Sequence, residues 1–198
     1  MGWKKKLLIG SVSIVFVLVA LGVLFGGSET ESSKTTGQVT GVSEQQSLTM
    51  KSASEMLPTR EEIPTEFVMS TVNDISTSVS VSGLEEAKSI STDKIEGSFG
   101  VISVGYSVYK FSTVEDAIVY HNGLVDNVVQ VGGYEEIKLS SDNCFSYKED
   151  YGFEAKMGQG ICVEKNVVFT VGFASSNSFK SPDGFIKDGI KLLDKKVS

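Results

Sequence analysis

Residues 99–111 read FGVISVGYSVYKF, and this stretch decides the fold class. It is dense in β-branched and aromatic residues, and both alternating sets of positions are largely apolar, which is typical of a strand covered on both sides. The next four residues, 112–115 (STVE), have the S-x-x-E form of a capping box, which predicts that a helix begins there. We therefore expect a central strand that leads directly into a helix.

Two amphipathic helices are predicted from apolar residues that recur at three- and four-residue spacing. The first is expected to end at Gly132-Gly133, and its apolar stripe comprises Ala117, Ile118, His121, Leu124, Val125, Val128 and Val129. The second begins at Ser181-Pro182-Asp183, which supplies an N-cap, a first-turn proline and a first-turn acid. Its stripe comprises Phe185, Ile186, Ile190, Leu193 and Val197.

Alternation of apolar and polar residues predicts the other strands. They fall at residues 67–69, 75–81, 134–139, 143–148 and 160–173, the last as one strand or a pair. Residues 83–88 are predicted to form a short helical turn. The fold class expected from this order is α+β, an antiparallel β-sheet with two α-helices packed on one face.

The N-terminus carries an uncharged apolar run, residues 7–25, whose ends are Leu7 and Phe25. A helix needs about 20 apolar residues to cross ~30 Å of hydrocarbon, so this run predicts a transmembrane helix. Three lysines, Lys4 to Lys6, precede the run, which predicts a single-pass protein of the cell membrane with a cytoplasmic N-terminus and an extracytoplasmic C-terminal domain. A cleaved signal peptide is the alternative, although the run is longer than a usual h-region and lacks a clear A-x-A-like site.

Three segments follow from this pattern. Residues 1–27 are the cytoplasmic lysines and the anchor, and residues 28–56 are a flexible Ser/Thr-rich stalk without apolar periodicity. Residues 57–198 are the extracytoplasmic α+β domain. Only three of the eighteen basic residues precede Phe25, and no acidic residue does, so the remainder carries a formal net charge of −10. Such a charge repels phosphate backbones, and we expect no nucleic-acid partner.

The only two cysteines, Cys144 and Cys162, are predicted to form a disulfide, because thiols in an oxidising compartment usually pair. A hairpin between the strands around them would bring the two residues opposite each other, with both cysteines on the outward face. Free, metal-binding or redox-active cysteines are the alternatives, and the absence of a C-x-x-C spacing argues against a redox site.

His121 is the only histidine, and it lies on the apolar stripe of the first predicted helix. A partly buried histidine with a hydrogen-bond partner is the ordinary interpretation, and a ligand or general base is the functional one. One histidine cannot build a multi-histidine metal site, so no metal and no cofactor are predicted. Gly158 and Gly160 do not continue into G-x-G-x-x-G, because position 163 is Val. No catalytic residue is assigned, and the sequence leans against an enzyme.

Residues 57–66 (LPTREEIPTE) form a lead-in that two prolines stiffen. Together with the Lys-flanked anchor and the polar stalk, this lead-in resembles uncharacterised surface-anchored proteins of ammonia-oxidising archaea. The resemblance implies a compartment and an anchor, and it implies no activity.

The function predicted from the sequence is that of a membrane-anchored, non-catalytic binding or accessory domain for an extracytoplasmic protein, solute or envelope component. An extracytoplasmic enzyme with a carboxylate-based site is one alternative, and a structural envelope spacer is another. A concave pocket that encloses two acids with raised pKa values would favour the enzyme. A flat exposed apolar patch would favour the accessory domain.

Overall fold

The computed structural model describes residues 48–96, 100–151, 155–176 and 180–198. Residues Leu48–Ser198 form a unit of their own. The predicted anchor, residues 1–27, and most of the predicted stalk, residues 28–47, lie outside the described residues. Among the helices of the described part, none is both long and apolar enough to span a bilayer.

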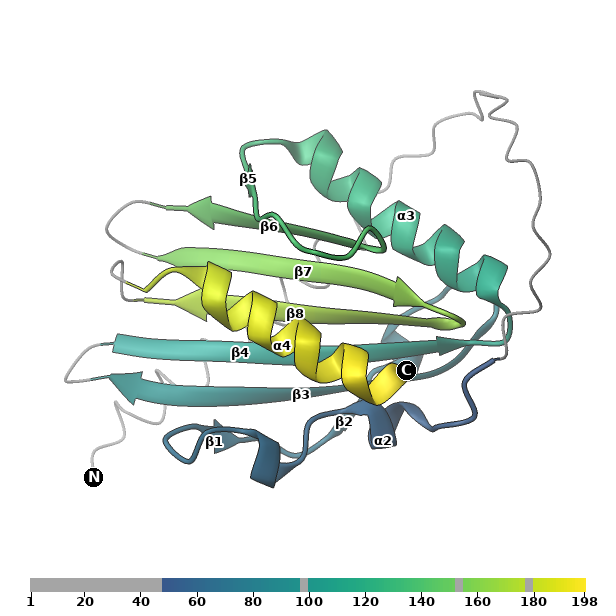
Figure 1. Ribbon diagram of the computed structural model, residues 1–198, viewed down its shortest axis with the longest axis horizontal. Helices are drawn as coiled ribbons and strands as arrows, with labels where there is room; N and C mark the ends of the chain where they lie inside the picture. Colours follow the sequence, from purple (N-terminus) through teal and green to yellow (C-terminus); the bar gives the residue numbers. More distant parts are fainter. Residues whose placement is uncertain (1–47, 97–99, 152–154, 177–179) are drawn as a thin grey trace. The chain divides into compact units, whose positions relative to one another are not determined.

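The centre of the unit is one antiparallel sheet in the strand order β1-β3-β4-β8-β7-β6-β5, with β2 also paired to β3 (Figure 1). The strands are β1 (Val68–Met69), β2 (Asn73–Asp74), β3 (Leu84–Glu96), β4 (Gly100–Phe111), β5 (Glu135–Glu136), β6 (Cys144–Asp150), β7 (Lys156–Glu164) and β8 (Val167–Ser175). The described helices are α2 (Ala53–Met56), α3 (Val114–Val131) and α4 (Pro182–Val197), with 3-10 turns η1 (Arg60–Glu62) and η2 (Ser76–Ser78). The antiparallel α+β class is therefore confirmed.

Strand β4 lies between β3 and β8, so the prediction of a central strand is confirmed. Its neighbour β3 corrects another prediction, because residues 84–88 of the predicted helical turn belong to this long strand. Most side chains of β3 are polar or charged, and its extended form depends on pairing with β4 along nearly its whole length. Long-range pairing has outweighed the local pattern here.

The helix boundaries follow the predicted caps closely. Helix α3 begins one residue later than the predicted capping box implies, because Thr113 is the N-cap and its hydroxyl accepts a 3.1 Å hydrogen bond from the Asp116 amide. The helix ends at Gly132, whose φ of 67° suits glycine. Helix α4 has Ser181 as its N-cap and Pro182 in its first turn, as predicted.

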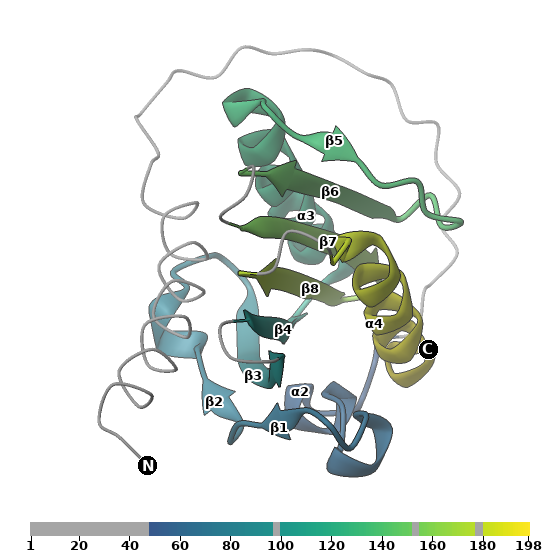
Figure 2. The same cartoon turned by 90° about the vertical axis from the view of Figure 1, so that its left-hand side faces the viewer.

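The two long helices pack on opposite faces of the sheet, which corrects the prediction that both lie on one face. Gly189 of α4 packs against Tyr106 and Val171, whereas Tyr120 of α3 packs against Tyr109, with ring centroids 5.2 Å apart. Successive residues of a strand point to opposite faces, so Tyr106 and Tyr109 of β4 lie on different sides. Figure 2 shows α4 running along one side of the strands. We call its side the α4 face and the other the α3 face.

Three glycines let α4 approach the sheet closely. A Cβ atom added at Gly160 of β7 would lie 2.5 Å from Ile190 Cδ1, and one at Gly158 would lie 2.8 Å from Ile186 Cδ1. On the helix itself, a Cβ atom at Gly189 would lie 2.6 Å from Val171 Cγ1. Gly158 and Gly160, which do not form a nucleotide-binding motif, therefore serve the packing of α4 on the sheet.

The folded unit begins earlier than predicted. Residues 48–56 belong to the predicted stalk, but Ala53 and Met56 of α2 are fully buried in the core of the α4 face. The Thr49 amide donates a 2.8 Å hydrogen bond to Asn166 Oδ1, and Asn166 Nδ2 donates one of 2.6 Å to the Phe111 carbonyl. Apolar periodicity could not reveal this segment, because one four-residue helix provides its burial.

Candidate ligand-binding site

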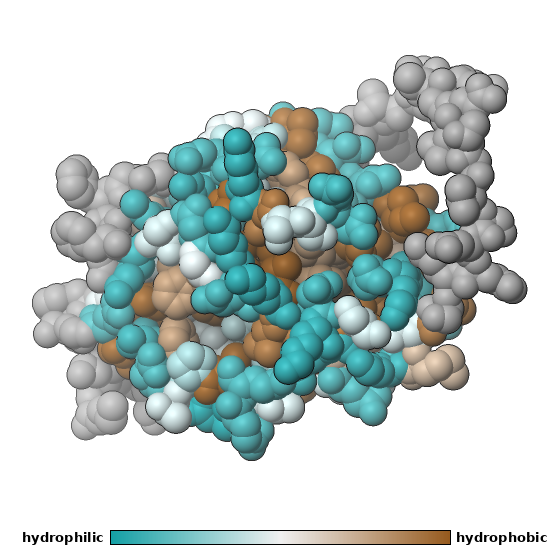
Figure 3. Space-filling model, viewed as in Figure 1, coloured by the Kyte–Doolittle hydropathy of each residue, from teal (hydrophilic) through white to brown (hydrophobic). Residues whose placement is uncertain are grey.

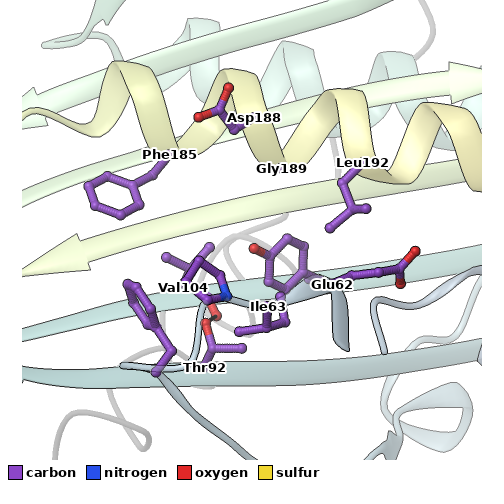
Figure 4. A pocket seen from close by; sticks show the side chains of 11 residues that line it. Glu62, Ile63, Thr92, Val104, Phe185, Asp188, Gly189 and Leu192 are labelled. Atoms are coloured by element: carbon purple, nitrogen blue, oxygen red, sulfur yellow. Dashed lines mark hydrogen bonds between the residues drawn. The ribbon is translucent and has the colours of Figure 1, made fainter. Parts of the chain in front are cut away.

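A cavity of about 300 Å³ lies on the α4 face, between α4 and the segment that follows η1 (Figure 4). Strands β3 and β4 form its floor. Side chains from four separate parts of the chain line it: Glu62, Ile63, Pro64, Phe67, Thr92, Val104, Tyr106, Phe185, Asp188, Gly189 and Leu192. Apolar walls with a few polar groups are the usual composition of a small-molecule site.

The wall opposite α4 is held in place by local hydrogen bonds. The Thr59 amide donates a 2.8 Å hydrogen bond to Glu62 Oε2, and the Phe67 amide donates one of 3.0 Å to the Pro64 carbonyl. The Arg60 guanidinium donates to the carbonyl of Thr65 at 3.2 Å. With the two prolines limiting backbone freedom, this wall is pre-formed and does not have to order around a ligand.

Aromatic rings form one end of the cavity. The rings of Phe67 and Phe185 meet edge to face, with centroids 6.3 Å apart, and Phe185 stacks on the buried ring of Phe173 at 4.9 Å. The ammonium group of Lys94 lies 5.9 Å from the Phe67 centroid. In Figure 4 the side chains of Phe185 and Leu192 extend from α4 toward the opposite wall.

Tyr106 is the most unusual polar residue of the cavity. Only 7% of the residue is exposed, and its hydroxyl, which forms no hydrogen bond with another described residue, is open to the cavity rather than sealed from water. Burial, with a contribution from the charge of Asp188, raises the pKa of Tyr106 to about 12. The hydroxyl is therefore protonated at neutral pH and can still donate and accept a hydrogen bond.

Two carboxylates line the cavity, and they differ in whether an ion-pair partner compensates their charge. Glu62 forms a 2.8 Å ion pair with Lys196; burial raises its pKa, but hydrogen bonds from Lys196 and the Thr59 amide outweigh this, so the pKa is below its ordinary value. Asp188 has no hydrogen-bond or ion-pair partner within the described part of the chain. Figure 4 places its carboxylate on the outer side of α4, at the edge of the cavity.

The predicted disulfide between Cys144 and Cys162 is confirmed. The two cysteines are direct partners in the register of β6 and β7, with Cα atoms 4.1 Å apart. The expectation that both point outward is wrong, because Cys162 is 1% exposed and belongs to the core of the α4 face, against which Cys144 packs. The prediction assumed a sheet covered on one side, whereas this sheet is covered on both.

The structure separates the other predicted site residues from the cavity. His121 lies on α3, on the opposite face of the sheet, where its Nδ1 atom is 3.2 Å from Asn122 Oδ1 and its buried Nε2 atom has no hydrogen-bond partner. Leu7 and Phe25, the predicted membrane-spanning ends, lie outside the described residues. No group of three or more metal-ligating side chains occurs within the described ranges.

Sequence reasoning missed the cavity, and its parts explain why. Ile63 belongs to the lead-in, Phe67 to the strand predicted directly after it, and Asp188 lies on the polar side of the α4 stripe. Residues more than a hundred positions apart form the site, and no short motif links them. The available indication was Tyr106, which places a hydroxyl on the apolar side of a strand otherwise occupied by Val104 and Val108.

Comparison with known proteins finds no matching protein family and no similar curated protein. Among solved structures, the extracellular domain of PknH from Mycobacterium tuberculosis is similar with a TM-score of 0.49, at 13% identity over 73% of this chain and 92% of that one. A structure from Bacteroides thetaiotaomicron VPI-5482 has a TM-score of 0.33, at 16% identity over 63% of this chain and 43% of that one. Similarities at this level carry no functional argument.

Proposed function

We propose that this chain is a membrane-anchored, extracytoplasmic binding domain that holds a small molecule in the cavity between α4 and the η1 segment. The observation that carries the proposal is the cavity of about 300 Å³ itself, which has largely apolar walls and is lined by Tyr106, whose hydroxyl forms no hydrogen bond with another described residue. A polar group of a ligand can take this hydrogen bond in place of water.

The cavity favours binding over catalysis. A carboxylic acid catalyst that works near neutral pH needs a raised pKa. Glu62 shows the opposite shift, because Lys196 and the Thr59 amide stabilise its charged form. Its carboxylate is also engaged in holding the wall of the cavity.

The proposed location rests on the uncharged run from Leu7 to Phe25 and on the lysines before it. The Cys144–Cys162 disulfide supports it, since such bonds persist in oxidising compartments. Trypsin treatment of intact cells tests this placement, because cleavage after Lys34 would release the folded domain into the medium. A domain that is released only after permeabilisation would contradict an extracytoplasmic location.

Ligand binding is tested with the full chain in dodecyl maltoside and a library of small molecules, detected by saturation-transfer NMR. Leu192 lines the cavity, so Leu192→Trp should fill it and abolish binding of compounds that bind the wild type. Lys191→Gln alters an exposed neighbour on α4 and should leave binding unchanged. The proposal is wrong if no compound distinguishes the wild type from Leu192→Trp while circular dichroism shows that both are folded.

A further inference from the structure

We infer that the ligand of this cavity is a small organic cation, an alkylammonium group on a compact apolar body. The inference rests on the proposed function and specifies its ligand class. Tyr106 and Phe185 would contact the apolar body inside the cavity, and the ammonium group would lie at the edge, near Asp188.

The charged residues that line the cavity favour a positively charged ligand. Its lining includes two carboxylates and no lysine, arginine or histidine. Lys196 neutralises Glu62 across a 2.8 Å ion pair, whereas Asp188 has no ion-pair partner among the described residues. Asp188 is exposed, so an anionic ligand at the edge of the cavity would be repelled by its carboxylate, and a cation there would form an ion pair with it.

The aromatic residues favour the same ligand. An ammonium group is attracted to the face of an aromatic ring, and cages of aromatic residues with a nearby acid are a common way of binding alkylammonium ions. Phe67, Tyr106 and Phe185 all line the cavity. Lys94 Nζ lies 5.9 Å from the Phe67 centroid, so a ligand cation would approach Tyr106 and Phe185 rather than this ring.

The Tyr106 hydroxyl defines the donor that the ligand should carry. Its oxygen can accept a hydrogen bond from an N–H group, and it lies within the electrostatic influence of Asp188. A purely apolar ligand would fill the volume but leave Tyr106 without a partner. An alkylammonium ion that retains an N–H bond satisfies both Tyr106 and Asp188.

Figure 3 shows the surface of the molecule on the side of α4. Hydrophilic residues predominate there, with hydrophobic residues between them rather than in one broad patch. A broad apolar patch would be expected of a protein-docking surface. The arrangement suits a small molecule better than a protein partner.

Three matched probes test the inference at pH 7: cyclohexylamine as the cation, cyclohexanol as the neutral analogue and cyclohexanecarboxylate as the anion. They share one ring and differ in charge. Binding to the full chain in dodecyl maltoside is measured by NMR titration, with the signal of Leu192→Trp subtracted to remove partition into the micelle. We expect the cation to bind at least tenfold more tightly than cyclohexanol, and the carboxylate to bind most weakly.

Three substitutions test which residues produce the preference for the cation. Asp188→Asn should lower the affinity for cyclohexylamine about tenfold and leave that for cyclohexanol unchanged. Asp194→Asn removes the same charge from α4 outside the cavity and should change neither affinity. Tyr106→Phe should weaken both cyclohexylamine and cyclohexanol, because each uses the hydroxyl.

The outcomes separate the two proposals. If cyclohexanol or the carboxylate binds as tightly as the cation, the cavity is a binding site but the inferred ligand class is wrong. If Asp194→Asn lowers the affinity as much as Asp188→Asn, the preference reflects net charge and the assigned site is wrong. If none of the three probes gives a signal that Leu192→Trp removes, the inference fails, and the library experiment then decides separately whether the cavity binds any other molecule.

Discussion

The two faces of the sheet are covered by helices of similar length in different ways. Helix α4 has six buried residues, and glycines on both sides of the contact bring it close to the strands. Helix α3 has three buried residues, and Val119 and Val131 on its outer side are 71% and 81% exposed. The difference indicates that the α4 face holds the main core, with the cavity at its edge, and that α3 is a more weakly attached cover.

Truncating one core side chain on each helix should give the largest difference in unfolding free energy between the two faces. Leu193 of α4 is fully buried, so we expect Leu193→Ala to lower the free energy of unfolding by about 3–4 kcal/mol. Val128 of α3 is 6% exposed and smaller, and Val128→Ala should cost about 1–2 kcal/mol. Urea unfolding of the full chain, followed by circular dichroism, measures both. Equal losses would show that the two helices contribute alike.

Reducing the disulfide should have the next largest effect on the free energy of unfolding. A loop closed between Cys144 and Cys162 stabilises the fold by about 3 kcal/mol in the loop-entropy model. We expect the free energy of unfolding to fall by about this amount when urea titrations contain a phosphine reductant. The double variant Cys144→Ala/Cys162→Ala is the control and should not respond to the reductant. A wild type that is equally stable with and without reductant would contradict the prediction.

A matched pair of glycine substitutions sharpens the comparison. Gly160→Ala places a methyl group against Ile190 at 2.5 Å and should destabilise the fold by about 1–3 kcal/mol. Gly123 of α3 has no neighbour within 4 Å, so Gly123→Ala should stabilise the fold by up to about 1 kcal/mol through helix propensity. Opposite signs of the two changes in urea midpoint are the expected result. A stabilising effect of Gly160→Ala would mean that α4 can move away from the sheet at no cost.

Alkaline titration tests Tyr106 on the α4 face, and comparison with Tyr106→Phe separates it from the other tyrosines. The pKa of Tyr106 is raised to about 12, chiefly by burial. Its contribution to stability is complete below about pH 10, the ordinary tyrosine value, and is lost as pH rises toward 12, because the unfolded chain releases this proton first. The slope from this residue is at most about 1.4 kcal/mol per pH unit.

Tyr106→Phe is the control for that titration. The variant should lose stability less steeply than the wild type between pH 10 and pH 12, while Tyr147, whose pKa is also raised to about 12, continues to contribute in both. Identical slopes in urea titrations across this range would show that Tyr106 is not shielded from water.

The α4 half of the fold could be predicted from sequence, and the α3 half only in part. Four of the five predicted stripe residues of α4 are buried and Phe185 is half-buried, because this regular helix on the sheet follows the 3.6-residue period. In α3 the predicted stripe included Ile118 and Val129, which are 43% and 50% exposed, and omitted Tyr120. The ring of Tyr120 reaches Tyr109 and Phe111, so aromatic pairing outweighs the period of the aliphatic residues.

The cavity could not be predicted, because it depends on how distant segments meet. The sequence identifies the prolines of the lead-in and the stripe of α4, but not that Phe67 meets Phe185. Strand β3 could not be predicted for the same reason, because its largely polar residues form a strand by pairing with β4. By contrast, the disulfide was predictable from two cysteines and a hairpin, since few alternatives existed.

The entry of the chain into the fold also has a mechanical consequence. Thr49 is hydrogen-bonded to Asn166, which is itself bonded to the Phe111 carbonyl, and Met56 and Leu57 are buried directly afterwards. A pulling force applied to the chain before residue 48 is therefore resisted at these contacts, ahead of residues 59–67 that form the cavity wall. The contacts at the start of the folded unit bear tension in the N-terminal chain first. The tension does not reach the cavity wall until these contacts break.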